Sequence, residues 1–273
     1  MDLCSIFTVC TPRPEILSGD LSADIFAAKL RPVVEKRAPH IYQDPSVFFA
    51  NTFVTNGLQE LLGEVFGRLT GQRVGSPVIR LETSFGGGKT HDEIALWHLA
   101  KQGRSPLVED ERFTEILTLL PEQPIQVAAV DGRDLSPEEG IYHAETGITT
   151  KTIWGEIAYQ VKGIEGYELL RGSDERGISP GTAVLERLIQ DRPTLIILDE
   201  IARYLSAAKA KRVEESNLAK QVIAFLFSLM DCAAACNNLV FVYSLASSTD
   251  TFAEETEELQ RELRSASARQ ERI

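Results

Sequence analysis

The chain has 273 residues, 43% of them apolar, and a formal net charge of −12 at pH 7. This length and apolar fraction are enough for one large α/β domain or two small ones, and they exclude an intrinsically disordered chain. The acidic balance repels a phosphate backbone, so we expect weak or no direct nucleic acid binding.

The beginning of the chain has no feature of a secretory signal. Asp2 and the short apolar stretch before Thr11 lack the basic n-region and the long apolar h-region of a signal peptide. No apolar run approaches the length of a membrane span. The cysteines, at positions 4, 10, 232 and 236, have neither C-x-x-C spacing nor histidines at zinc-ligand intervals. We therefore expect a cytoplasmic protein with reduced thiols and no membrane segment.

Residues 1–75 are expected to form a helical segment that packs on a core domain of residues 76–273. Apolar side chains recur at helical spacing over residues 22–36. Two further helices are predicted at 45–53 and 56–69, before the first strand of the core.

A glycine-rich turn then separates a short apolar strand, predicted at 77–81, from a helix predicted at 90–102. The glycines at 86–88 can adopt positive φ and turn several backbone N–H groups toward one anion, and the helix N-terminus adds its positive end. Lys89 would contact the β- and γ-phosphates of a nucleotide, and the Thr90 hydroxyl would bind a Mg²⁺ ion. The sequence therefore predicts a phosphate-binding loop.

This loop differs from the usual pattern G-x-x-x-x-G-K-[ST], because Thr83 stands where the first glycine is expected. A glycine turn beside a chance Lys-Thr pair is the alternative interpretation, and the flanking strand and helix argue against it. Asp92 and Glu93 lie in the first turn of the helix, and we interpret them as complements to the helix dipole rather than as catalytic groups.

A second strand is predicted at 125–130 and ends in an Asp-Gly turn. Residues 133–191 then form a long helical insertion. Its helices are expected at 151–161 and 181–190, joined by a glycine-rich and charged connection at 163–180.

The apolar run at 194–198 predicts a strand that is buried on both faces. A helix at about 216–235, a strand at 239–243 and an acidic helix from 251 to the end follow. Strands that alternate with helices predict a mainly parallel sheet, with the four strands in the order 1-4-3-2.

Asp199 and Glu200 come directly after the strand at 194–198. The carboxyl ends of parallel strands form the ligand crevice, so we expect Asp199 to lie beside Thr90. Asp199 would hold Mg²⁺ through water, and Glu200 would polarise an attacking water molecule. Two solvated acids at a strand end are the alternative, which the order of the two motifs disfavours.

Ser244 follows the strand at 239–243 and is a candidate for holding the attacking water near the γ-phosphate. The competing hydroxyls are Ser247, Ser248 and Thr249, and such a cluster after a strand also serves as a helix cap. The arginines available as fingers are Arg203, Arg261 and Arg264, although a solvated surface position is the simpler interpretation of each.

Four segments together resemble the bacterial and archaeal ATPases of the domain of unknown function 499 family: residues 44–49 with 55–58, residues 85–91, residues 154–158 and residues 198–200. The resemblance spans nearly the whole chain. It implies an α/β fold of the AAA+ or ASCE type of P-loop NTPase, with a three-layer parallel sheet core and an N-terminal helical preface. ATP and Mg²⁺ are the implied ligands.

The resemblance also implies which residues form the nucleotide-binding loop: Ser84, Phe85, Gly86, Gly87, Gly88, Lys89, Thr90 and His91. Members of this family usually carry Gly or Pro where this chain has Ser84. They are typically long proteins encoded near DNA methyltransferases and helicases in phage-defence or restriction-like clusters, which implies DNA-modifying or helicase partners. A fifth core strand and a helical lid are expected beyond Ile273, so the chain alone should hydrolyse ATP poorly and depend on homo-oligomer formation.

Together these observations predict the ATP-binding and ATP-hydrolysing core of an AAA+-like ATPase. Lys89, Glu200 and Ser244 are the expected catalytic residues, and Thr90 and Asp199 the expected metal ligands. A nucleotide-gated switch or scaffold with little turnover is an alternative. A P-loop kinase is a third, which the adjacent Glu200 and the absence of an arginine-rich lid disfavour. The identity of the base is left open, because apolar packing and backbone contacts leave no motif.

Overall fold

The computed structural model describes residues 17–19, 27–82, 88–190, 192–245 and 271–272. Its centre is a parallel sheet with the strand order β2-β5-β8-β1-β9. The strands are β1 (Val78–Leu81), β2 (Gln126–Asp131), β5 (Thr194–Asp199), β8 (Leu239–Ser244) and the two-residue β9 (Glu271–Arg272). Every adjacent pair in this sheet is parallel. The order of the four longer strands confirms the predicted 1-4-3-2 arrangement.

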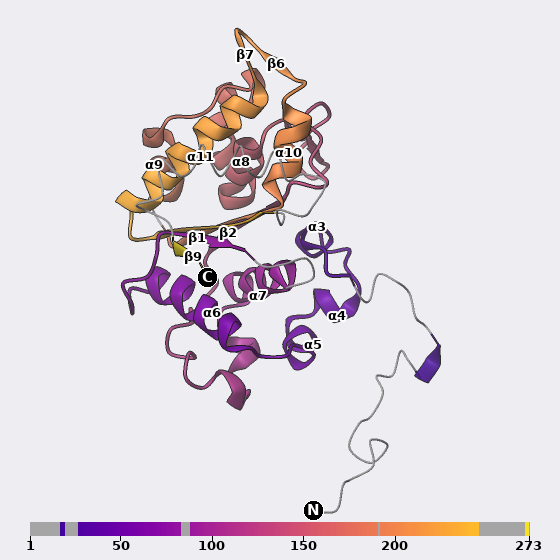
Figure 1. Cartoon of the computed structure of the whole chain (residues 1–273), viewed down its shortest axis with the longest axis vertical. Helices are drawn as coiled ribbons and strands as arrows, with labels where there is room; N and C mark the ends of the chain where they lie inside the picture. The colour runs from indigo at the N-terminus through magenta and orange to yellow at the C-terminus, as the bar shows by residue number, and fades with distance from the viewer. Residues whose placement is uncertain (1–16, 20–26, 83–87, 191, 246–270, 273) are drawn as a thin grey trace, which may run out of the picture.

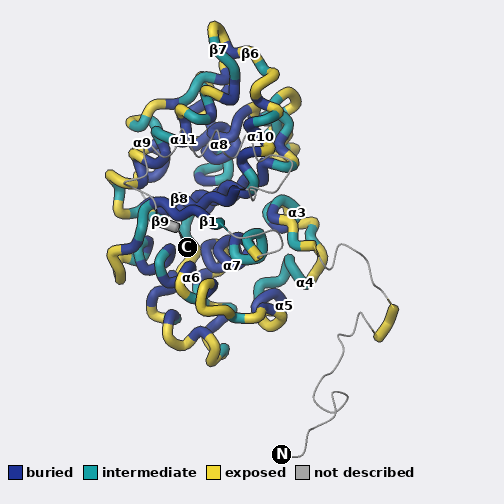
Figure 2. Tube along the Cα trace, in the orientation of Figure 1, coloured by how far each residue is buried: buried dark blue, intermediate teal, exposed yellow. Residues whose placement is uncertain are grey.

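The sheet is buried on both faces because its strands are apolar almost without interruption. All six residues of β5 and all six of β8 are buried. Alternate residues point to opposite faces, so that Ile196 and Phe241 join one hydrophobic cluster while Ile197 and Val242 join the other. Figure 2 shows the buried strands between two layers of helices.

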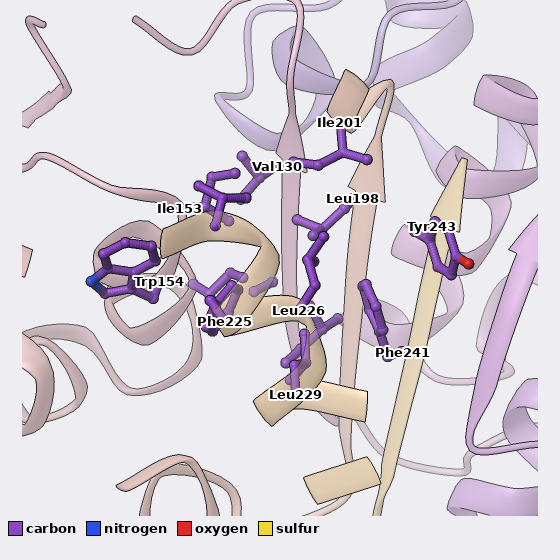
Figure 3. Packing of buried hydrophobic residues seen from close by; sticks show 14 of the residues in the cluster. Val130, Ile153, Trp154, Leu198, Ile201, Phe225, Leu226, Leu229, Phe241 and Tyr243 are labelled. Atoms are coloured by element: carbon purple, nitrogen blue, oxygen red, sulfur yellow. The ribbon is translucent and has the colours of Figure 1, made fainter. Parts of the chain in front are cut away.

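One face is covered by the helices that follow β2, as Figure 1 shows: α8 (Ile153–Arg176), α9 (Thr182–Ile189), α10 (Ile201–Ala208) and α11 (Leu218–Ala235). Trp154 of α8 and Phe225 of α11 meet with ring centroids 5.6 Å apart. Figure 3 shows both rings on the same side of the sheet as Leu198 and Phe241. This cluster holds the site-bearing strands β2 and β5 rigidly in place.

The opposite face is covered by α3 (Leu30–Val34), α4 (His40–Gln43), α5 (Pro45–Ala50), α6 (Asn56–Leu69) and α7 (Lys89–Gln102). Side chains of α3, α5, α6 and α7 share one hydrophobic cluster with the strands. The 3₁₀ helices η2 (Ser105–Leu107) and η3 (Glu111–Phe113) close this layer. The architecture is an α/β fold with a parallel sheet between two helical layers, as in Rossmann-like and P-loop-like folds.

Helix α8 is longer than expected, because the connection predicted at 163–180 is helical as far as Arg176. The helix is broken at Lys162 and Gly163, where Gly163 has φ 60° and ψ −138°. Beyond this break the buried Asp174 carboxylate accepts hydrogen bonds from the backbone N–H and the hydroxyl of Thr152, at 2.9 and 2.5 Å. This tertiary contact outweighs the low helix propensity of the glycines in this segment.

Other elements also differ from the sequence prediction. The hairpin β3 (Ile141–His143) and β4 (Ile148–Thr150), the short pair β6 (Arg212–Val213) and β7 (Ser216–Asn217), and helix α10 were not expected. The helix predicted at 22–36 is reduced, in its described part, to α3. Most of the acidic helix predicted from 251 lies outside the described residues. The backbone of Glu271–Arg272 pairs with β1, so a fifth strand is present before Ile273, whereas the fifth strand was expected beyond it.

Among the described helices, α11 has the length and apolar character needed to cross a membrane, so the expectation that no apolar run approaches this length is wrong. Half of its apolar window is buried inside the protein. Its inward residues, including Val222 and Leu229, belong to the cluster on the sheet. We therefore interpret α11 as a core helix.

Candidate active site

Three strands end in polar residues at the same edge of the sheet. β2 ends at Asp131, β5 at Asp199 and β8 at Ser244. The strand register sets Asp131 opposite Asp199. Each of these residues is at most 4% exposed. Because ligands of open α/β sheets bind outside the carboxyl ends of the strands, this edge is the natural place for a site.

Hydrogen bonds join four of the residues that the sequence singled out. The Ser244 hydroxyl donates to Asp199 Oδ1 at 2.5 Å and accepts from the backbone N–H of Glu200 at 3.0 Å. The Thr90 hydroxyl, in the first turn of α7, donates to Asp199 Oδ2 at 3.2 Å. The predicted proximity of Asp199 and Thr90 is therefore present in the structure.

Glu200 turns the chain sharply between β5 and α10. Its backbone is left-handed, with φ 46° and ψ 44°, a conformation that costs a non-glycine residue on the order of 1 kcal/mol. Gly132 makes this turn possible, because a Cβ there would lie 2.6 Å from the carbonyl oxygen of Glu200. The Glu200 side chain keeps 25% of its surface exposed, so it remains accessible from solvent.

Arg133 is a site residue that the sequence analysis missed. Its Nη2 lies 2.7 Å from Asp131 Oδ2 and 3.1 Å from Asp199 Oδ2, and its Nη1 lies 3.9 Å from Glu200 Oε1. Burial opposes its charge, but the bond to Asp131 and the negative charges of all three carboxylates outweigh burial and raise its pKa. The available signal was its position directly after the Asp-Gly turn that ends the second predicted strand.

The pKa values of Asp199 and Glu200 are both raised. Burial, with the negative charge of Asp131, raises the pKa of Asp199, and the positive charge of Arg133 opposes the rise. Burial also raises the pKa of Glu200, with Arg133 opposing and Asp199 adding to the rise. A partly exposed carboxyl with a raised pKa is the kind of group that acts as a general base near neutral pH.

Glu93 lies beneath this carboxylate cluster and is fully buried. It stands three residues after Thr90, so both side chains occupy the same face of α7. Neither carboxyl oxygen of Glu93 has a hydrogen-bond partner among the described residues. Burial, and then the charge of Asp199, raises its pKa well above the ordinary range. The interpretation of Glu93 as a dipole complement is wrong, whereas Asp92 does lie in the first turn, where burial raises its pKa to about 6.

The helix that begins at Lys89 carries the described end of the predicted phosphate loop. Its N-cap, Gly88, has φ 86° and offers no side-chain cap, and the first intrahelical bond runs from Asp92 N–H to Gly88 C=O at 2.9 Å. A helix leaves its first N–H groups without intrahelical acceptors, which favours anions at this end. The remaining loop positions, Ser84, Phe85, Gly86 and Gly87, lie outside the described residues.

His91 points away from the carboxylates and toward α5. Its ring stacks on Phe48 with centroids 4.4 Å apart, and its Nε2 lies 2.9 Å from the Thr52 hydroxyl. Thr52 already donates to the Phe48 carbonyl, so His91 must be the donor to Thr52. Burial lowers the pKa of His91. The His91 side chain therefore packs α7 against α5. Of His91, only the backbone would then be available for the predicted nucleotide binding.

The donor set suits magnesium only when a phosphate is also present. Within the described residues, no group of three or more His, Cys, Asp or Glu side chains is placed to hold a metal ion. Thr90 and Asp199 supply one hydroxyl and one carboxylate. Mg²⁺ characteristically takes one or two such protein oxygens and completes its shell with phosphate oxygens and water. The residues present thus fit a magnesium nucleotide and not an isolated metal centre.

A family model, the DUF499 N-terminal domain, matches residues 13–269. The chain belongs to the DUF499 family. The match includes every residue of the site described above, so the site is part of the DUF499 domain itself. Comparison of this DUF499 chain with curated proteins gave no match.

A cavity of about 540 Å³ lies beside β2 in this DUF499 domain and adjoins the site. It reaches Asp131, but neither Thr90 nor Glu200 lines it. Its buried Glu156 carboxylate is satisfied by His143 and Thr150, at 2.9 and 2.6 Å. The buried carboxylate of this cavity is thus already paired within the protein.

Two further groups of candidates complete the comparison with the sequence. Arg203 lies 3.6 Å from Glu200 Oε2 and is 42% exposed. The remaining candidates lie outside the described residues: Ser247, Ser248, Thr249, Arg261 and Arg264.

Proposed function

We propose that this DUF499 domain is a P-loop ATPase core of the AAA+ type, which binds ATP with Mg²⁺ and hydrolyses it at the edge formed by β2, β5 and β8. The observation that carries this proposal is the 3.2 Å contact between Thr90 Oγ1 and Asp199 Oδ2. It joins the helix after the glycine loop to the strand that ends in Asp-Glu. A hydroxyl and a carboxylate in this relation are the two protein groups that a magnesium nucleotide requires.

The residues of the chain divide the work as follows in this proposal. Lys89 and the N–H groups at the start of α7 bind the phosphates, and Thr90 and Asp199 hold the metal. When bound, Mg²⁺ would neutralise phosphate charge as the terminal phosphoryl group leaves. The loop from Ser84 to Gly87 would enclose the phosphates.

Glu200 would accept the proton of the attacking water, because it is accessible and its pKa is raised toward neutrality by burial. Ser244 would act by holding its neighbours in position. Its buried hydroxyl donates to Asp199 and accepts from the Glu200 N–H, so it ties the metal-binding carboxylate to the base. A Ser244 hydroxyl engaged in this way would influence the attacking water through Glu200.

A nucleotide-gated switch that binds ATP with little turnover is the second candidate. The observation in its favour is that Arg133 contacts both Asp199 and, at 3.9 Å, Glu200, which restrains the two groups that hydrolysis needs. The described contacts contain nothing that favours a kinase over these two. Whether the domain is an ATPase or a nucleotide-gated switch, we propose that it is a cytoplasmic homo-oligomer that works with DNA-modifying or helicase partner proteins in a defence system.

The test is calorimetric titration of the chain with ATP and Mg²⁺, followed by measurement of phosphate release over a range of protein concentrations, with and without DNA. An ATPase binds ATP and releases phosphate, with a rate per molecule that rises as oligomers form. A switch binds ATP without release at any concentration. Absence of nucleotide binding would overturn both, and tight, salt-sensitive DNA binding would contradict the expectation drawn from the net charge.

A further inference from the structure

Arg133 is attached to the site by two unequal sets of contacts. Asp131 holds it through the backbone N–H at 2.9 Å, through Nε at 3.0 Å and through Nη2 at 2.7 Å. Asp199 holds it through one contact, from Nη2 at 3.1 Å. Asp131 is therefore the anchor of Arg133, and the bond to Asp199 can be exchanged without releasing the side chain.

The exchangeable contact falls on the oxygen that a metal would need. Asp199 Oδ1 is bound by the Ser244 hydroxyl at 2.5 Å. Asp199 Oδ2 accepts from both Thr90, at 3.2 Å, and Arg133, at 3.1 Å. A cation held jointly by Thr90 and Asp199, whether directly or through a bound water molecule, would have to use Oδ2. The guanidinium therefore competes for this oxygen with the metal or with its water.

The charges indicate where Arg133 goes once it is displaced. Its guanidinium lies between Asp199 and Glu200, with Nη1 3.9 Å from Glu200 Oε1. Its side chain is 23% exposed, so part of it is accessible to solvent. If a divalent cation neutralised Asp199, the terminal phosphate of the proposed nucleotide would be a new anion within the same site. A planar guanidinium binds phosphate oxygens in a bidentate manner.

We propose that Arg133 is the ligand of the terminal phosphate of ATP, which it contacts after the magnesium nucleotide has displaced it from Asp199 Oδ2. This inference rests on the proposed function and adds to it a residue that distinguishes ATP from ADP. Arg133 would supply, from within the same chain, positive charge to the phosphoryl group during its transfer.

The test compares the wild type with Arg133→Met for binding of Mg²⁺-ADP and of a non-hydrolysable Mg²⁺-ATP analogue, by calorimetry. We expect the variant to lose about ten- to a hundred-fold in affinity for the analogue and less than about two-fold for ADP. Arg104→Met is the matched control, because Arg104 also pairs with a carboxylate, that of Glu122, but lies just after the C-terminal end of α7, opposite the end that carries Thr90. It should change neither affinity.

A second measurement addresses the competition itself. Electron paramagnetic resonance of Mn²⁺, titrated without nucleotide, should show only weak binding to either protein, because phosphate ligands are missing, but tighter binding to Arg133→Met than to the wild type. If Arg133→Met does not fold by circular dichroism, Arg133→Lys keeps the charge but lacks the planar fork, and it should still lose affinity for the analogue selectively.

Equal losses for ADP and the analogue, or no loss for either, would overturn the inference while leaving nucleotide binding intact. Unchanged or weaker Mn²⁺ binding to Arg133→Met would show that Arg133 and the metal do not compete for Asp199 Oδ2. If the wild type binds neither nucleotide, it is the proposed function that fails, so the two failures are distinguishable.

Discussion

The hydroxyl of Thr90 lies 3.2 Å from Asp199 Oδ2, although 109 positions separate the two residues in the chain. The contact exists because α7 packs under the sheet with its N-terminus at the carboxyl edge, where β5 ends. It brings a helix N-terminus, which favours phosphate, next to a carboxylate, which favours a metal.

The first concerns phosphate binding by Lys89. Lys89→Ala should weaken ATP binding by about ten- to a hundred-fold, because the phosphates lose a cationic partner. Lys101→Ala is the control, since Lys101 lies at the other end of the same helix and stacks on Trp97. Calorimetry on both folded variants measures the effect. An unchanged affinity of Lys89→Ala for ATP would contradict the proposal that this segment is a P-loop.

The second separates binding from chemistry at Glu200. Glu200→Gln keeps the size and hydrogen-bonding capacity of the side chain but cannot accept a proton, so hydrolysis should fall by roughly 10²- to 10⁴-fold while ATP stays bound. Phosphate release and nucleotide retention on an oligomeric preparation measure the two effects. Glu186→Gln, in α9 and away from the site, is the control. Wild-type turnover in Glu200→Gln would rule out Glu200 as the base.

The third concerns the pH dependence of stability at Glu93. Its pKa in the folded state is raised above 4.5, the value for an ordinary glutamate, so the folded protein holds this proton more tightly than the unfolded chain. The contribution of Glu93 to stability is therefore full below about pH 4.5 and decreases as the pH rises toward the folded-state pKa. Glu93→Gln mimics the protonated form and lacks this decrease.

Denaturant unfolding of the wild type and Glu93→Gln at several pH values provides the measurement. The variant should match the wild type at acidic pH and become progressively more stable than it toward pH 8. Glu60→Gln, on the exposed side of α6, should produce no such divergence. If Glu93→Gln instead became less stable than the wild type as the pH rises, the folded protein would favour the charged form of Glu93, and the prediction would be wrong.

The fourth concerns the close approach of β2 to Glu200. In Gly132→Ala the new Cβ would meet the Glu200 carbonyl oxygen at 2.6 Å, so the Asp199-Glu200 segment must shift. We expect a loss of more than about 1 kcal/mol in the free energy of unfolding, together with a loss of hydrolysis. Gly181→Ala is the matched control, because no atom lies within 4 Å of its Cβ position. Equal stability of the two variants would contradict the close packing at Gly132.

Much of the fold could be predicted because its signals are local. The apolar runs at β1, β2, β5 and β8 specified buried strands, and helix α6 begins and ends at the predicted residues. The connection after Gly163 could not be predicted in the same way. It is helical because its buried Asp174 is bonded by Thr152, which lies before the break in the helix, and composition does not reveal this contact.

The sequence by itself determined the chemical groups at the sheet edge, since Thr90, Asp199, Glu200 and Ser244 each follow a strand or open a helix at a position that the backbone pattern reveals. Only the tertiary structure decided the roles of Arg133, Glu93 and Gly132. Their significance comes from neighbours contributed by other strands: three carboxylates around one guanidinium, a buried acid beneath Asp199, and a carbonyl oxygen against Gly132. Charge interactions and steric contacts act through space, so residue spacing along the chain carries no record of them.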